Sequence, residues 1–236
     1  MVSYFYMEGT GVGKLSIVAT PIGNLEDITL RALRTLKEAA VIYCEDTRVT
    51  SKLLARYELH TPLKRLDANV EASKAVEVVE RLQKGEHVAY VSDAGTPTIS
   101  DPGYRLVAAV QKELGDSVVE AIPGASALVA ALSISGIAAD EFLFLGFPPH
   151  KKGRQTLLKR IASTEGVVVL YESSHRILKL LEEFADAIPA RNIVVAREIT
   201  KKFENVQRGV AVDLLAHFEK ETGEVRGEFV VIVEAE

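Results

Sequence analysis

Short apolar runs alternate with longer amphipathic segments along most of the chain. Runs of Val, Ile, Leu and Ala predict buried strands, and apolar residues that recur every three or four positions predict helices. In the first half this pattern predicts strands at 15–19, 41–44, 87–91 and 117–122. It predicts four helices. The first is capped by Asp27 or Thr29 and the second by Asn69, and the other two lie at 104–114 and 125–135. Because strand, loop and helix repeat in this order, we expect a mostly parallel sheet with right-handed crossovers.

The second half mixes strands and helices less regularly. Strands are predicted at 142–145, 167–171, 193–196, 203–208 and 229–233, and helices at 153–162, 174–187 and 210–221. Closely spaced strands of this kind favour a smaller lobe with a mixed sheet. We therefore expect an α/β protein of two lobes with a cleft between them. Its parts are an N-terminal tail at 1–13, an N-terminal α/β lobe at 14–136 and a C-terminal α/β lobe at 137–236.

Glycine, proline and small hydroxyl residues gather in the loops that follow the predicted strands. The longest of these loops reads SDAGTPTISDPG at 92–103, which exceeds the usual connection of about 2–6 residues between a strand and a helix. Similar loops lie at 20–24, 123–127, 171–176 and 196–201. Open α/β sheets bind ligands at the carboxyl ends of their strands, and glycine allows close approach of the backbone. The pattern favours an uncharged or zwitterionic small ligand over a triphosphate.

Composition and charge argue against several classes of protein. No long apolar run predicts a membrane span, and the single cysteine, Cys44, excludes a disulfide framework and favours the cytoplasm. The five histidines are scattered, so no metal site is predicted. The sequence GTGVGK at 9–14 has the wrong spacing for a phosphate-binding loop. A net charge of -5 argues against general nucleic-acid coating.

Two charged groups are candidates for chemistry or binding. Glu45, Asp46 and Arg48 come directly after the strand at 41–44, so they lie at the predicted carboxyl edge of the sheet. The alternative is that they only cap a helix and form a surface ion pair. The segment 146–160 contains Lys151, Lys152, Arg154, Lys159 and Arg160 without any acid. It is either a basic rim for RNA or an ordinary solvated face.

Six motifs occur in register from Leu15 to the C-terminus: VATPIGNLEDIT, CEDTR, SDAGTPTISDPG, IPGASA, LGFP and YESSHR. Together they resemble the tetrapyrrole methylase superfamily, and most closely its branch that methylates small-subunit ribosomal RNA. The first loop, TPIGNLED, departs from the porphyrin-methylating branch, which resembles GxGxGD at this place. This departure argues against a tetrapyrrole substrate.

The resemblance implies two α/β lobes, S-adenosylmethionine as cofactor, a homodimer, and methylation of a cytidine ribose 2'-hydroxyl in the ribosomal decoding region. It implies cofactor contacts at Pro21, Asp93, Gly95, Thr96, Ile99, Ser126, Ala127, Tyr171, Glu172 and Ala196. Candidate bases for the hydroxyl proton are Glu45, Asp46, Glu172 and His175. Candidate substrate contacts are Arg48, Lys151, Lys152, Arg154, Arg176, Arg197 and Lys201. Two alternatives stay open: a methyltransferase of a tetrapyrrole or another small molecule, and a ribosome-binding module without chemistry.

Overall fold

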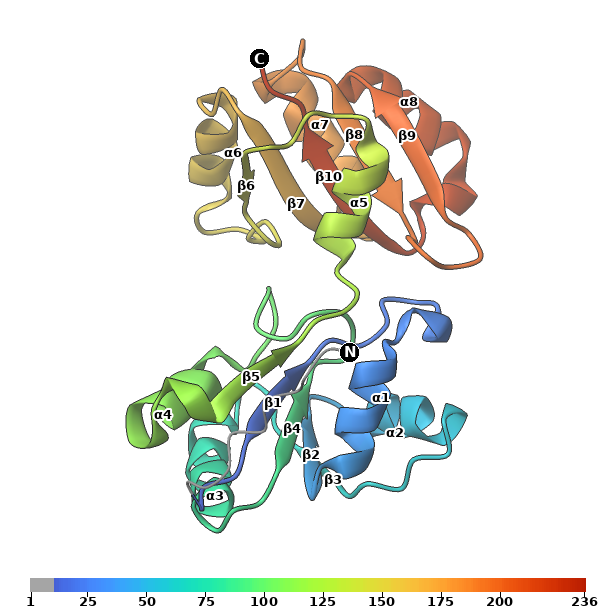
Figure 1. The fold of residues 1–236 in the computed structure, drawn as a ribbon. Coiled ribbons are helices and arrows are strands. Elements are labelled where there is room, and N and C mark those ends of the chain that lie inside the picture. The colour runs from blue at the N-terminus through green and yellow to red at the C-terminus, as the bar shows by residue number, and fades with distance from the viewer. Residues whose placement is uncertain (1–10) are drawn as a thin grey trace. The chain divides into compact units, whose positions relative to one another are not determined.

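The computed structural model describes residues 11–236. The first ten residues of the predicted tail at 1–13, and the start of the GTGVGK segment, lie outside the described residues. The chain divides after Ala125 into two compact units, each with its own sheet (Figure 1). The first unit is the N-terminal lobe and the second is the C-terminal lobe of the predicted α/β architecture.

The first unit is built on a parallel sheet, as the sequence pattern predicts. The sheet has five strands in the order β3-β2-β4-β1-β5. Its strands are β1 (Leu15–Val18), β2 (Val41–Cys44), β3 (Leu63–Arg65), β4 (Val88–Val91) and β5 (Val119–Ile122). Its helices are α1 (Leu30–Glu38), α2 (Thr47–Arg56), α3 (Glu71–Gln83) and α4 (Tyr104–Leu114).

Helices cover both faces of this first sheet (Figure 1). Tyr43 and Tyr90 point into a core formed with α3 and α4, whereas Ile42 and Ala89 point into a second core formed with α1 and α2. Because neighbouring residues of one strand enter opposite cores, β2 and β4 are apolar at every position rather than at alternate ones. This is why they are recognisable in the sequence as continuous apolar runs.

The second unit is built on a mixed sheet with the strand order β6-β7-β10-β8-β9. Strand β6 runs parallel to β7, and all other neighbours in this sheet are antiparallel. Its strands are β6 (Phe142–Phe144), β7 (Val167–Ser173), β8 (Ile193–Arg197), β9 (Asn205–Gly209) and β10 (Glu228–Val233). Its helices are α5 (Ala127–Ser135), α6 (Arg154–Ala162), α7 (Ile177–Ala187) and α8 (Ala211–Lys220).

The core of the second unit lies between its sheet and the helices α6, α7 and α8. Helix α5 lies on the opposite face of the sheet, where it packs on β8 and β10 (Figure 1). The Arg208 side chain on β9 donates hydrogen bonds to the carbonyls of Ile134 (2.7 Å) and Ser135 (3.2 Å) at the end of α5. These contacts place α5 in the second unit, so the predicted boundary after Gly136 comes too late in the chain.

Most of the predicted elements are present, with small shifts at their ends. Thr29 caps α1 by accepting the N–H of Ala32 (3.0 Å), which is one of the two caps predicted there. Asn69 does not cap α3, because Asp67 accepts the N–H groups of Asn69 (2.9 Å) and Val70 (3.3 Å) instead. Strand β3 was not predicted, and helix α2 was expected only in the alternative in which the charged residues after β2 cap a helix. No helix in the described part of the chain is both long enough and apolar enough to span a bilayer.

Candidate functional site

The loops that follow β1, β4 and β5 are joined to one another at the carboxyl edge of the first sheet. The Thr20 N–H donates to the Gly95 carbonyl (2.9 Å), and the Gly95 N–H donates back to the Thr20 carbonyl (3.0 Å). The Thr96 hydroxyl donates to the Ala125 carbonyl (3.1 Å). Residues 19–24, 92–103 and 123–125 therefore form one connected surface, which we call the joined loops.

The joined loops contain five of the cofactor contacts that the resemblance implies. Pro21 and Gly95 are buried, Thr96 is partly buried, and Asp93 and Ile99 are exposed. A Cβ atom on Gly95 would lie 3.3 Å from the Ile22 side chain and 3.7 Å from the Ala125 carbonyl oxygen. Gly95 also has a φ of +79°, so both space and backbone conformation favour glycine at the point where the loops meet.

The backbone of the 92–103 loop is strained at several positions. Thr98 and Ser100 have positive φ angles of 74° and 64°, which non-glycine residues rarely adopt. Gly103 has a φ of 120°, and a Cβ atom there would lie 2.5 Å from the Tyr90 ring. Such conformations persist only where the surrounding structure holds them, and they gather at functional sites.

A buried carboxylate holds the end of this loop in place. One oxygen of Glu71, the first residue of α3, accepts the N–H groups of Gly103 (3.0 Å), Arg105 (2.8 Å) and Leu106 (3.2 Å). It therefore caps α4 from a distance, since Gly103 has no side chain that could do so. Sequence reasoning missed Glu71, although a glycine at the start of a helix was a signal that another residue must supply the cap.

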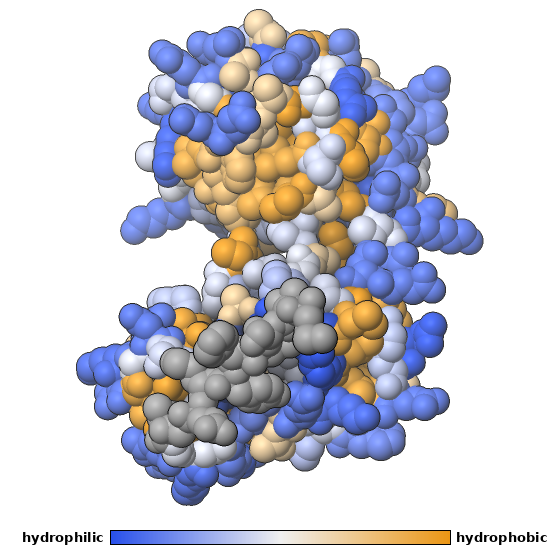
Figure 2. All heavy atoms as spheres, viewed as in Figure 1, coloured by the Kyte–Doolittle hydropathy of each residue, from blue (hydrophilic) through white to orange (hydrophobic). Residues whose placement is uncertain are grey.

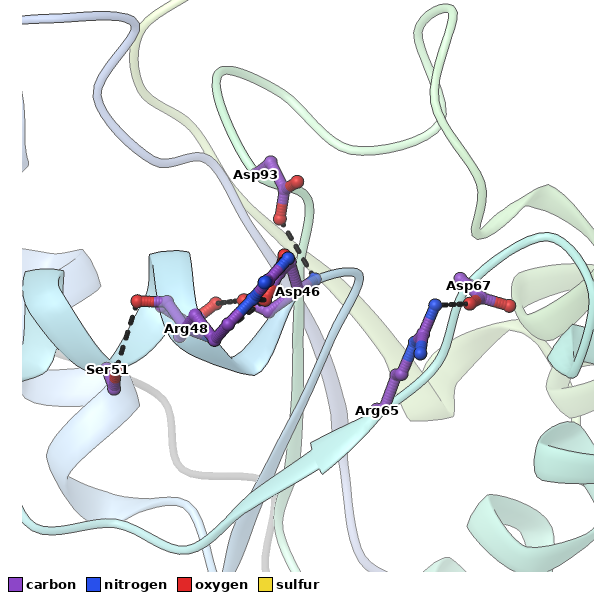
Figure 3. Close-up of polar contacts among 7 residues, drawn as sticks. Asp46, Arg48, Ser51, Arg65, Asp67 and Asp93 are labelled. Carbon is purple, nitrogen blue, oxygen red and sulfur yellow. Dashed lines mark hydrogen bonds and ion pairs between the residues drawn. The ribbon is translucent and has the colours of Figure 1, made fainter.

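Acidic residues gather beside the joined loops, after β2 (Figure 3). The Asp93 carboxylate accepts the N–H of Asp46 (3.0 Å), which connects the β2 and β4 loops. Asp46 caps α2 by accepting the Arg48 N–H (2.8 Å) and also pairs with the Arg48 guanidinium (2.5 Å). These hydrogen bonds lower the pKa of Asp46 to about 2. Asp46 and Arg48 thus match the structural alternative, a cap and a surface ion pair.

Glu45 differs from Asp46 although the two residues are neighbours. Burial raises the pKa of Glu45, and the nearby carboxylates, Asp93 first among them, raise it further. Burial also raises the pKa values of Asp93 and Asp101. Two adjacent carboxyl groups with opposite pKa shifts are typical of sites where one group takes up a proton and the other stays ionised.

In the second unit, three of the predicted cofactor residues lie close together. The Tyr171 hydroxyl accepts the N–H of Leu128 (3.1 Å) in the first turn of α5, next to Ser126 and Ala127. Glu172 is buried, pairs with Arg176 (2.7 Å) and accepts the Ser173 N–H (2.8 Å). Ala196 is fully buried within β8. Glu172 is therefore held in an internal ion pair, and Ala196 presents no side-chain surface.

Three of the predicted substrate contacts are internal residues, which corrects the sequence analysis. Arg154 is 5% exposed and pairs with Glu183 (2.6 Å). Arg197 is 7% exposed and donates to the carbonyls of Arg226, Phe203 and Gly223. The Arg176 side chain is 15% exposed and pairs with Glu172. Buried guanidinium groups need partners. Glu172 is four residues from Arg176, but Glu183 lies 29 residues from Arg154 along the chain.

The other basic candidates lie at the surface. Lys151, Lys152 and His175 are exposed, and the Arg48 side chain is 87% exposed beside Asp46. Lys201 is partly buried and pairs with Glu198 (2.8 Å) and Glu228 (2.7 Å). Within residues 11–236, no group of three or more His, Cys, Asp or Glu residues could hold a metal ion.

Comparison with known sequences identifies related proteins along nearly the whole chain. Residues 14–215 match the family of tetrapyrrole (corrin/porphyrin) methylases. The "Ribosomal RNA small subunit methyltransferase I" of Thermotoga maritima is 44% identical over 209 residues, which are 89% of this chain and 93% of that protein. The protein of the same name from Pasteurella multocida is 45% identical over 94% of this chain and 79% of its own length.

Solved structures share the fold at low sequence identity. A cobalt precorrin-4 methyltransferase of cobalamin biosynthesis has a TM-score of 0.69 and 20% identity, with 98% of each chain covered. A diphthine synthase has a TM-score of 0.71 and 16% identity, with 94% of this chain and 90% of that one covered. A uroporphyrin-III C-methyltransferase of Thermus thermophilus, solved with S-adenosyl homocysteine, has a TM-score of 0.61 and 19% identity over 94% of this chain and 97% of that one.

Proposed function

The chain belongs to the tetrapyrrole (corrin/porphyrin) methylase family and is a methyltransferase of small-subunit ribosomal RNA, and we propose that it methylates the ribose 2'-hydroxyl of a cytidine in the decoding region. The joined loops at the carboxyl edge of the first sheet are the observation that carries this proposal. Such an edge is where open α/β sheets bind small ligands. The reaction takes place in the cytoplasm, where ribosomal subunits are assembled.

The joined loops fit S-adenosylmethionine, a zwitterion with a positive sulfonium. Gly95 allows the loops after β1, β4 and β5 to meet closely, and the partly exposed Thr96 contributes a neutral polar group. Pro21, Asp93, Gly95, Thr96 and Ile99 are the proposed cofactor contacts of the first unit. Ser126, Ala127 and Tyr171, further contacts implied by the resemblance, lie close together in the second unit. When bound, the cofactor supplies the electrophilic methyl group. The protein itself must orient the hydroxyl and exclude water.

Glu45 is the proposed proton acceptor for the ribose hydroxyl. It lies at the end of β2, next to the residue that Asp93 holds, and its raised pKa makes it a better base than its neighbour. Asp46 is held as an anion by Arg48 and positions the start of α2. His175, which is exposed in the loop after β7, is the second candidate. A positioned general base contributes typically about 10²–10⁴-fold to the rate.

Single-turnover methyl transfer to isolated small ribosomal subunits tests these assignments. Glu45→Gln should slow transfer by about 10²–10⁴-fold without weakening cofactor binding in calorimetry. Asp46→Asn and His175→Gln are the matched variants, and both should retain more activity than Glu45→Gln. The wild-type rate should rise with pH as Glu45 loses its proton. A Glu45→Gln enzyme with the wild-type rate would remove Glu45 from the mechanism.

The alternatives are separated by two measurements on the wild-type protein. Transfer of a labelled methyl group to small subunits, compared with transfer to a porphyrinogen, distinguishes an RNA substrate from a tetrapyrrole. Cofactor binding by calorimetry distinguishes both enzymes from a binding module without chemistry. We expect binding of the cofactor and transfer to the small subunit only. Mapping of the labelled nucleotide then tests the cytidine 2'-hydroxyl.

Helix α5 is the proposed centre of a homodimer interface. Seven of its nine residues are apolar, and Val129 and Ile134 remain 59% and 40% exposed. Apolar residues cover much of this face of the second unit (Figure 2). A helix of this kind is usually buried on every side. Sedimentation should give a dimer for the wild type and a monomer for Val129→Asp with Ile134→Asp, whereas a monomeric wild type would contradict the interface.

A further inference from the structure

The loop between β6 and α6, residues 146–153, is held from inside the second unit by two arginines. The Arg176 guanidinium donates a hydrogen bond to the Pro148 carbonyl (2.8 Å). The Arg154 guanidinium donates one to the next carbonyl, that of Pro149 (3.2 Å). Two consecutive carbonyls of one surface loop are thus fixed by one buried and one partly buried guanidinium group.

Each of these arginines is fixed in turn by a carboxylate. Arg176 pairs with Glu172 (2.7 Å), whose side chain has no solvent exposure. The Arg154 Nε donates to both oxygens of Glu183 (2.9 and 2.8 Å). The two acids beneath the loop are therefore neutralised on the inner side, and the loop is held in one conformation.

The outer side of the same loop carries an aromatic ring and two lysines. Phe147 is 53% exposed, although one side of its ring contacts Tyr171 at a centroid distance of 5.4 Å. His150, Lys151 and Lys152 are exposed, and no acid occurs in residues 146–160. Such a combination of an exposed ring and exposed lysines suits a nucleic-acid strand, in which bases stack on rings and phosphates pair with lysines.

We propose that the loop at 147–152 binds an unpaired stretch of ribosomal RNA, with the Phe147 ring stacked on one base and Lys151 and Lys152 paired with the flanking phosphates. This inference rests on the proposed function and identifies the part of the second unit that recognises the RNA. Because the two arginines hold the loop beforehand, RNA binding does not have to order it, which lowers the cost of association. Sequence-specific proteins commonly read RNA through unpaired bases of this kind.

Binding of the protein to isolated small ribosomal subunits, measured across a salt titration, tests the proposal. Phe147→Leu keeps an apolar side chain but removes the aromatic face, and it should weaken binding by about 5- to 150-fold, the usual range for loss of one stacked base. Lys151→Gln with Lys152→Gln should lower the slope of log affinity against log salt by about 1.4, or about 0.7 for each phosphate contact.

Two control variants remove the same kinds of group elsewhere. Phe203→Leu removes an exposed ring of similar size, one that lies under the Lys202 ammonium (5.6 Å). Lys159→Gln with Arg160→Gln removes two exposed charges from α6, outside the loop. Both controls should bind the small subunit much more tightly than the corresponding loop variants.

Calorimetry with S-adenosylmethionine and labelled-methyl transfer by the wild type are run in parallel. Phe147→Leu should bind the cofactor like the wild type. If Phe147→Leu binds the small subunit as tightly as the wild type, the loop proposal is overturned. It is also overturned if Phe147→Leu weakens binding of the cofactor but not of the subunit, because the ring would then lie at the cofactor. If the wild type itself fails to methylate small subunits, the proposed function falls, and this result is distinct from either failure of the loop.

Discussion

Replacement of Glu71 by alanine tests whether one buried carboxylate holds the 92–103 loop. Glu71 is 2% exposed, and one of its oxygens accepts three backbone N–H groups at the start of α4. A hydrogen bond to a charged group contributes about 1.5–3 kcal/mol, and a buried N–H without a partner costs about 1–3 kcal/mol. The three donors share one oxygen, so each contributes only about 1–1.5 kcal/mol, at the low end of these ranges. Together they give an expected loss of about 3–5 kcal/mol in the stability of the first unit.

Hydrogen exchange and urea unfolding measure this loss. The amides of Gly103 and Leu106 are buried beside Glu71, so they should exchange much faster in Glu71→Ala. Glu71→Gln keeps a carbonyl oxygen but loses the negative charge at the helix start, and it should cost about 1–2 kcal/mol. Glu80→Ala removes an exposed acid from the same helix, and it should change stability by less than about 0.5 kcal/mol. If Glu71→Ala were no less stable than Glu80→Ala, the anchoring role of Glu71 would be refuted.

Two further predictions concern stability. The Arg191 guanidinium donates hydrogen bonds to four backbone carbonyls, those of Glu234, Ile161, Thr164 and Gly166. Arg191→Met should therefore lower the stability of the second unit by about 3–5 kcal/mol in urea unfolding. The control Asn192→Ala, at an exposed position, should change it very little. The His87 ring forms a hydrogen bond with the Ser16 hydroxyl (Nε2 to Oγ, 2.8 Å), and burial lowers the pKa of His87. The unfolded chain therefore takes up a proton there more readily, and stability should fall as pH drops below about 6.5. His87→Gln should show a smaller fall, and equal pH profiles for both proteins would contradict the role of the ring.

Several local features of the fold could be predicted because they depend on neighbouring residues alone. Strand β2 and helix α4 were predicted at their observed bounds, since a buried parallel strand is apolar at every position and a helix repeats every three or four. Strand β3 was missed because Leu63–Arg65 is short, polar and paired on one side only. The boundary after Gly136 was placed too late because the packing of α5 depends on strands much further along the chain.

The burial and the pKa shifts of charged residues could not be predicted from the sequence. Arg154 and Lys151 belong to one basic segment, yet the first is buried against Glu183 and the second is exposed. Their spacing along the chain does not distinguish them, because the partner acid lies on another helix. Glu45 and Asp46 are adjacent, but one pKa rises and the other falls, since only Asp46 meets the Arg48 guanidinium.

The sequence by itself determined the α/β class and the residues expected to bind a cofactor. It could do so because the order of strands and helices, the chemistry of the loops and the family motifs are all properties of short stretches of chain. Parallel strands bring their carboxyl ends to one edge, and for that reason the site region could also be predicted. Only the tertiary structure decided which charges are neutralised, that Glu71 holds the longest loop, and that two arginines clamp the loop at 146–153. These facts depend on pairs of residues that folding brings together from distant parts of the chain.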